Sequence, residues 1–115
     1  MEVGETLLVY TAQEWREWLT QHHLDKTEIW LIYFKKASGK KGITYEQSVE
    51  EAICFGWIDG AIKTLDKDTY AGRFTPRRKK SHWTEANRLL AQRLIREGRM
   101  TEAGRAILPE SVLSN

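Results

Sequence analysis

The sequence predicts a single α+β domain with a small, mostly antiparallel sheet packed by about four helices, in the order β-α-β-α-β-β-α-α. Two capping-box motifs mark helix starts, and runs of β-branched and aromatic residues mark strands. A polar turn between two extended segments predicts a β-hairpin over about residues 57–75. The chain has 115 residues, of which 41% are hydrophobic and 30% charged. This size and composition fit one hydrophobic core, so the predicted domain spans residues 1–115.

The N-terminal part predicts a strand, a helix and a second strand. Residues 7–9 form a short apolar run. Thr11 and Glu14 then have the spacing of a capping box, which opens a helix. Residues 29–34 are an unbroken β-branched and aromatic run, which predicts a central strand covered on both faces. Residues 35–42 are rich in glycine and lysine but lack the spacing of a P-loop, so they predict an exposed connector.

A second helix and the hairpin follow. Thr44 and Gln47 form another capping box, and Gly56 is in position to end the helix. The segments 57–65 and 70–75 have the composition of strands, and the four polar residues between them suit a turn.

The C-terminal part is predicted to be helical. Ser81 is the expected N-cap of a helix whose apolar residues recur at helical spacing. These residues are Trp83, Ala86, Leu90 and Leu94. Gly98 is expected to end this helix, Thr101 to cap a short last helix, and Pro109 to stop it.

Several protein classes are excluded by composition. No apolar run approaches the roughly 20 residues that span a bilayer, which predicts no membrane insertion. The first residues lack the basic and then apolar pattern of a signal peptide. Cys54 is the single cysteine, so no internal disulfide can form. Together these features predict a cytoplasmic protein.

Charge is distributed unevenly along the chain. Residues 1–70 carry a net charge of −4, and residues 71–115 carry +6. A basic C-terminal half predicts an anionic partner, and the alternative is a solvated basic helix face.

The densest group of polar and aromatic residues lies in and beside the predicted hairpin. Strand alternation places Trp57 and Asp59 on one face and two isoleucines, at positions 58 and 62, on the other, as in the wall of a polar pocket. Asp59 and Arg73 would lie on neighbouring strands and could face each other. Arg77 follows the second strand, where its guanidinium can bind an anion beside free N–H groups of the helix expected near Ser81. The predicted ligand-binding residues are Trp57, Asp59, Arg73, Arg77 and Trp83. The alternative is a structural Asp59–Arg73 pair with the tryptophans packed around it.

The residues give less support for a metal site or for nucleophilic catalysis. The potential metal ligands have no recognised ligand spacing, so neither a metal nor another cofactor is predicted. These residues are His22, His23, His82 and Cys54. Cys54 lies between apolar residues and is expected to be an inert buried thiol. Ser81 and His82 are adjacent and would project in different directions, which argues against a nucleophile–base pair.

The leading functional prediction is a binding module for a small anionic or aromatic ligand. One alternative is RNA or single-stranded DNA binding through the surface from Arg77 to Arg99, where arginines are interleaved with aromatic residues. Another is an enzyme that uses Asp59 as general acid or base. A protein partner is the remaining alternative.

The combined motifs resemble the YdeI/OmpD-associated family, also called bacteriocin-protection proteins. The resemblance covers about residues 10–107, and it is specific only as a combination of motifs. The matching segments are 15–19, 30–31, 43–46, 49–60, 73–78, 81–84 with Asn87, and 98–104. The family more often has leucine at position 53 and serine at position 84.

The resemblance implies a bacterial protein with a role in stress or in tolerance of bacteriocins and cationic antimicrobial peptides. The family name also links it to an outer-membrane porin. No reaction and no catalytic residues are established for the family, so it implies none for this chain.

Overall fold

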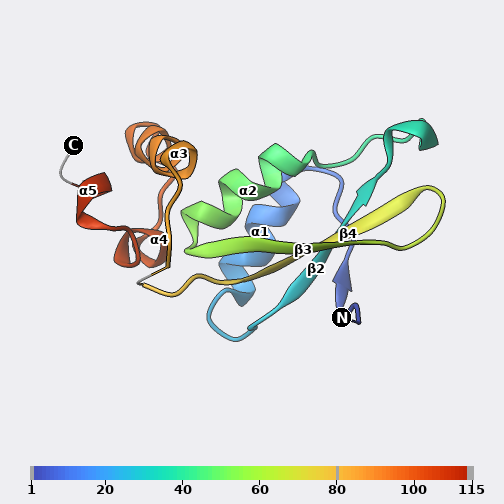
Figure 1. Ribbon diagram of the computed structural model, residues 1–115, viewed down its shortest axis with the longest axis horizontal. Helices are drawn as coiled ribbons and strands as arrows, with labels where there is room; N and C mark the ends of the chain where they lie inside the picture. Colours follow the sequence, from blue (N-terminus) through green and yellow to red (C-terminus); the bar gives the residue numbers. More distant parts are fainter. Residues whose placement is uncertain (1, 80, 114–115) are drawn as a thin grey trace.

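The computed structural model describes residues 2–79 and 81–113, which form an α+β fold as predicted (Figure 1). In chain order the elements are β1 (Thr6–Leu7), α1 (Ala12–His22), β2 (Ile29–Phe34), the 3-10 helix η1 (Lys36–Ser38), α2 (Tyr45–Cys54), β3 (Trp57–Thr64), β4 (Thr69–Pro76), α3 (Glu85–Arg96), α4 (Glu102–Ala106) and α5 (Glu110–Leu113). The described residues thus form five α-helices, where about four were expected. The additional helix follows Pro109, whose carbonyl accepts the N–H of Val112 at 2.9 Å and so begins another turn.

The four strands form one mixed sheet in the order β1-β2-β4-β3. β2 and β4 are antiparallel, as are β3 and β4, so the predicted hairpin is present. β1 pairs with β2 in parallel, which makes the sheet mixed. The first predicted strand is only two residues long, and β2 lies inside the sheet as its composition predicted.

The helices are divided between two places. α1 and α2 cover one face of the sheet, while α3, α4 and α5 lie together beyond the base of the hairpin (Figure 1). Both predicted capping boxes are confirmed: Thr11 with Glu14 begins α1, and Thr44 with Gln47 begins α2. The molecule is elongated, with principal extents of 45 × 25 × 25 Å.

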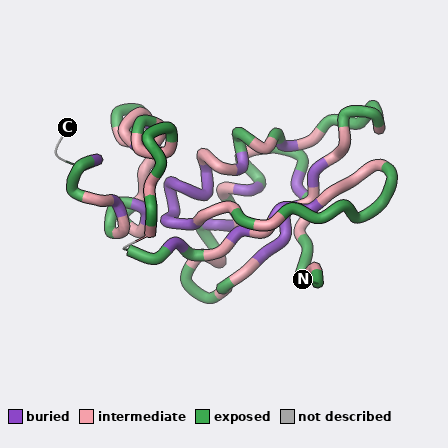
Figure 2. Tube along the Cα trace, in the orientation of Figure 1, coloured by how far each residue is buried: buried purple, intermediate pink, exposed green. Residues whose placement is uncertain are grey.

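The hydrophobic core fills the space between the sheet and the two covering helices. Buried positions gather there, whereas the turn of the hairpin is exposed (Figure 2). The largest fully buried side chains of the core are Trp15, Trp57, Tyr33, Phe74, Leu19, Ile29, Leu31 and Leu94. The core is therefore rich in aromatic residues.

A β-bulge in β3 alters which residues share a face. Asp59 pairs with Phe74, but Ile62 pairs with Gly72, so two residues of β3 stand opposite Arg73 alone. Residues that pair directly across an antiparallel sheet point to the same face, and successive residues alternate. Ile62 therefore lies on the same face as Asp59. The prediction that the two isoleucines share the other face is wrong, because regular alternation ends at the bulge.

α3 begins later than predicted. The N-cap is Thr84, whose Oγ1 accepts the backbone N–H of Asn87 at 3.1 Å. The Ser81 hydroxyl instead accepts a hydrogen bond from Arg77. Residues 81–84 therefore precede the helix without regular secondary structure, and the helix N-terminus expected near Ser81 is not there. Gly98 and Thr101 do have their predicted roles at the end of α3 and the start of α4.

Across residues 2–79 and 81–113, the structure contains no helix of the length and hydrophobicity that crossing a membrane requires.

Candidate functional site

The candidate site is built around Arg77, the first residue after β4. Its backbone N–H donates to the carbonyl of Gly56 at 2.8 Å, which continues the hairpin pairing by one residue. Its side chain is only 6% exposed. Nη1 donates to Ser81 Oγ at 3.1 Å and to the His82 carbonyl at 3.2 Å. The guanidinium carbon lies 4.0 Å from the ring centroid of Trp83, a cation–π contact. Arg77 thus joins the base of the hairpin to the segment that leads into α3.

Two buried donors at this site lack an acceptor. Within the described part of the chain, neither Arg77 Nε nor Trp83 Nε1 has a hydrogen-bond partner. Burial lowers the pKa of the Arg77 guanidinium, and the negative charge of Asp59 partly offsets this effect. No carboxylate among the described residues forms an ion pair with Arg77. Because buried charges are normally paired, a buried and unneutralised guanidinium favours an anion.

A surface pocket of about 430 Å³ opens beside this arginine. It is lined by Ile58, Thr75, Pro76, Arg77, Arg78 and Ser81. The lining combines two guanidinium side chains and two hydroxyls with the apolar side chains of an isoleucine and a proline. We call it the arginine pocket. Its volume lies within the range of about 300–1,000 Å³ that is usual for small-molecule sites.

Asp59 is hydrogen-bonded to Tyr45, the first residue of α2. The Tyr45 hydroxyl donates to Asp59 Oδ2. Tyr33 and Ser48 extend the network, with 2.6 Å between their hydroxyl oxygens. Burial raises the pKa of the Tyr45 phenol, and the hydrogen bond to Asp59 raises it further. Tyr45 was not predicted as a site residue, because it is contributed by another element and no local pattern marks it.

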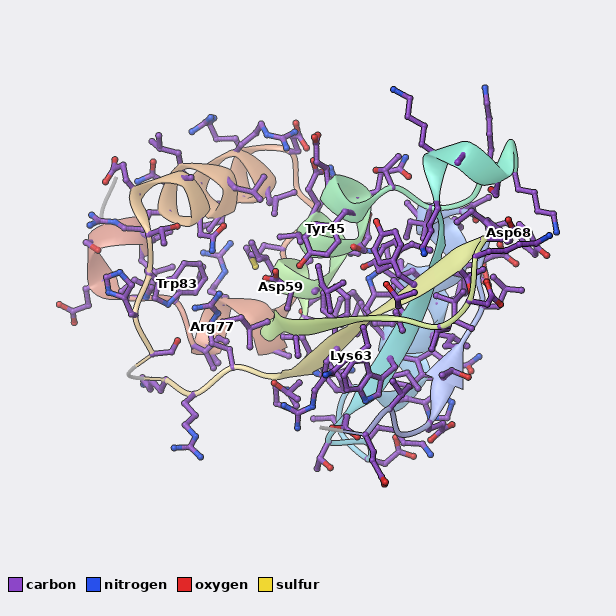
Figure 3. The ribbon with its side chains drawn as sticks, turned by 45° about the vertical axis from the view of Figure 1, so that its right-hand side comes forward. Tyr45, Asp59, Lys63, Asp68, Arg77 and Trp83 are labelled. Atoms are coloured by element: carbon purple, nitrogen blue, oxygen red, sulfur yellow. The ribbon has the colours of Figure 1, made fainter. Side chains whose placement is uncertain are left out.

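The structure brings three of the five predicted residues to the same end of the molecule. Trp83, Arg77 and Asp59 follow one another toward Tyr45, in the region between the hairpin base and α3 (Figure 3). Lys63 of β3 lies farther toward the hairpin turn. The residues that meet here come from α2, β3 and the connection between β4 and α3.

Arg73 lies on the face of the sheet opposite to Asp59. It pairs with Trp30 of β2, and its Nε donates to Glu28 Oε1 in an ion pair. Asp59 pairs with Phe74, the next residue along β4, so the two side chains point to opposite faces. The predicted facing pair of Asp59 and Arg73 is therefore wrong. Their strands are neighbours, but the register differs by one residue from the one that a facing pair needs.

Trp57 is part of the hydrophobic core. It is 1% exposed, and its ring packs edge-on against Trp18 with centroids 5.8 Å apart. The face of β3 that was predicted to line a polar pocket is the face covered by the helices, so Trp57 offers no stacking surface to a ligand.

Acidic residues of α2 neutralise part of the basic C-terminal half. Glu51 accepts from Arg16 and from Arg99, each at 2.8 Å, and Glu50 accepts from Arg93 at 2.9 Å. Burial lowers the pKa of Arg99, but the surrounding carboxylates more than compensate, so the net effect raises it. Two arginines of the surface predicted to bind nucleic acid are thus engaged within the protein.

Cys54 is fully buried, and burial raises the pKa of its thiol. In the described ranges, no three or more histidine, cysteine, aspartate or glutamate side chains gather as a metal ion would require.

Comparison with family models places most of the chain in a known family. A family model described as a domain of unknown function, DUF8412, matches residues 7–107. The chain belongs to the DUF8412 family. The match spans all of α1–α4 and the whole sheet apart from the first residue of β1, so it includes Arg77, Trp83, Asp59 and Tyr45. No curated protein and no solved structure is significantly similar to the chain. The description of the DUF8412 family names no activity, and the resemblance to YdeI/OmpD-associated proteins remains a prediction.

Proposed function

We propose that this DUF8412 protein is a binding module for a small anionic ligand, whose anionic group binds at Arg77. The observation that carries this proposal is the buried guanidinium, which has no carboxylate partner among the described residues and an unused Nε donor. A phosphate or carboxylate in the arginine pocket would supply the missing negative charge.

Neighbouring residues support an anion at this position. Arg78 and Ser81 line the arginine pocket and can donate to the same ligand. The Trp83 ring holds the Arg77 guanidinium in one orientation, and an oriented guanidinium loses less entropy when it binds. Asp59 lies near enough to act on the charge of Arg77 without forming an ion pair, which leaves the guanidinium available.

The biological setting is a separate proposal, which depends on the resemblance to the YdeI/OmpD-associated family. On that basis we propose a cytoplasmic role in stress or antimicrobial-peptide tolerance, exerted through the bound ligand. RNA or single-stranded DNA binding and Asp59-dependent catalysis remain alternatives that no contact in the described residues favours.

The experiment is a thermal-shift and calorimetric titration with inorganic phosphate, sulfate and acetate at constant ionic strength. We expect saturable binding of at least one anion, and a ligand at 100 times its Kd stabilises by about 2.7 kcal/mol. Arg77→Met should abolish the shift. Arg88→Met is the matched control, because Arg88 is a half-buried arginine of α3 that does not line the arginine pocket.

Arg77 also connects two segments, so Arg77→Met can lower the stability of the free protein. Each ligand-induced shift is therefore referred to the Tm of the same variant. Arg78→Met provides a second test, since Arg78 is exposed and lines the pocket. Equal losses in Arg88→Met and Arg77→Met, or no saturable binding by the wild type, would overturn the proposal.

A further inference from the structure

A second pocket is lined by Lys79, the residue that follows Arg78 of the arginine pocket. It has a volume of about 490 Å³ and lies against α4 and α5. Its lining includes the cations Lys79 and Arg105, one acid, Glu110, and the apolar side chains of Leu108, Pro109 and Leu113. We call it the apolar pocket.

Two consecutive residues of the chain line the two pockets. Arg78 lines the arginine pocket and Lys79 lines the apolar pocket. Consecutive Cα atoms are about 3.8 Å apart, which places a wall residue of one pocket beside a wall residue of the other. Both of these wall residues are cationic.

The two pockets differ in what they can bind. The arginine pocket offers guanidinium and hydroxyl donors, which together can satisfy the several oxygens of a phosphate group. The apolar pocket has cations at its rim but an apolar lining, in which Leu108 is buried and Leu113 is 42% exposed. An inorganic anion would leave this apolar lining in water, whereas an attached hydrocarbon or ring would cover it.

We infer that the combined site takes a phosphate monoester with an apolar or aromatic body, the phosphate at Arg77 and Arg78 and the body in the apolar pocket. This inference rests on the proposed anion site at Arg77 and adds the chemical class of the ligand. The body comes either from an aromatic base, as in a nucleotide, or from an aliphatic chain.

Calorimetric titration of the full chain with inorganic phosphate, phenyl phosphate, hexyl phosphate and AMP tests the inference. At least one of the three esters should bind tenfold or more tightly than inorganic phosphate. Leu113→Ser should weaken binding of that ester at least threefold while leaving the affinity for inorganic phosphate unchanged. Leu89→Ser is the matched control, because Leu89 is 56% exposed on α3 and lines neither pocket. Tighter binding of AMP than of hexyl phosphate would identify a nucleotide-like ligand, and the reverse would identify an aliphatic one.

The two proposals fail in different ways. If inorganic phosphate binds through Arg77 but no ester binds more tightly, or if Leu113→Ser and Leu89→Ser have equal effects, the inference is overturned and the anion site stands. If phosphate, sulfate, acetate and all three esters fail to bind, or if binding persists in Arg77→Met, the proposed function itself is overturned.

Discussion

The guanidinium of Arg77 lies 4.0 Å above the ring of Trp83, and each side chain retains a buried donor without a partner in the described residues. Arg77 extends from the end of the hairpin, and Trp83 precedes α3. The contact therefore positions the proposed anion site and joins two parts of the fold.

Replacing Trp83 should separate the effect of the ring from that of the indole N–H. Trp83→Leu removes the cation–π contact, which contributes about 1–2 kcal/mol when the cation is largely buried, so stability and anion affinity should both fall. Trp83→Phe keeps a ring face but lacks the N–H. Because the indole N–H is buried and Trp83 does not line the arginine pocket, Trp83→Phe should retain anion binding with a smaller loss of stability than Trp83→Leu. Chemical denaturation and phosphate titration measure the two effects, and unchanged affinity in both variants would contradict the proposed role.

Arg73 should have no direct part in anion binding. It does not line the arginine pocket, and its side chain is engaged with Glu28. Arg73→Gln should leave the anion-induced thermal shift unchanged and lower stability by about 1 kcal/mol or less, because the ion pair is about one-third exposed. A loss of affinity comparable to that of Arg77→Met would mean that Arg73 also contributes to the anion site.

Alkaline pH should destabilise the protein through its buried tyrosines. Burial raises the pKa of Tyr33, and its hydrogen bond to Ser48 offsets this effect only in part; burial also raises the pKa of Tyr45. A folded-state pKa above the unfolded value of about 10 means that the folded protein retains the proton more tightly. The stability that the protonated phenols contribute is therefore complete below about pH 10 and is lost as the pH rises further.

Tyr33→Phe should flatten the alkaline decline in the free energy of unfolding, measured by urea denaturation at several pH values between about 8 and 11. The control is Tyr10→Phe, since Tyr10 is 55% exposed and should leave the profile unchanged. Equal profiles for the wild type and Tyr33→Phe would show that burial of this phenol does not govern the pH dependence.

Gly104 of α4 allows the C-terminal helices to pack against α2. A Cβ at this position would overlap the carbonyl of Cys54 and would lie 2.6 Å from Met100 Sδ. Because backbone atoms cannot move aside easily, Gly104→Ala should lower the free energy of unfolding by about 1–3 kcal/mol or more. Gly60→Ala is the control: its Cβ would meet only the Arg73 carbonyl, at 3.7 Å. Similar denaturation midpoints for the two variants would contradict the close approach of Gly104 to the Cys54 carbonyl.

Local patterns predicted much of the secondary structure because they act within a few residues. The two capping boxes, the strand at 29–34 and the left-handed glycines at positions 56 and 98 all appear where the sequence indicated. The sequence predicts Ser81 as the N-cap of α3, but the Ser81 hydroxyl binds Arg77 and Thr84 caps the helix. Several residues before α3 could serve as a cap, and only a contact from outside the helix determines which one does.

The sequence by itself determined the α+β class, the hairpin and two residues, Arg77 and Trp83, on which the proposed site depends. The tertiary structure decided which face each side chain occupies. A bulge and a one-residue difference in register separated Asp59 from Arg73, and packing against α1 placed Trp57 in the core. The apolar pocket likewise exists only because α4 and α5 fold back beside Lys79. Register and helix docking depend on the free energy of the whole fold, and local sequence patterns do not report them.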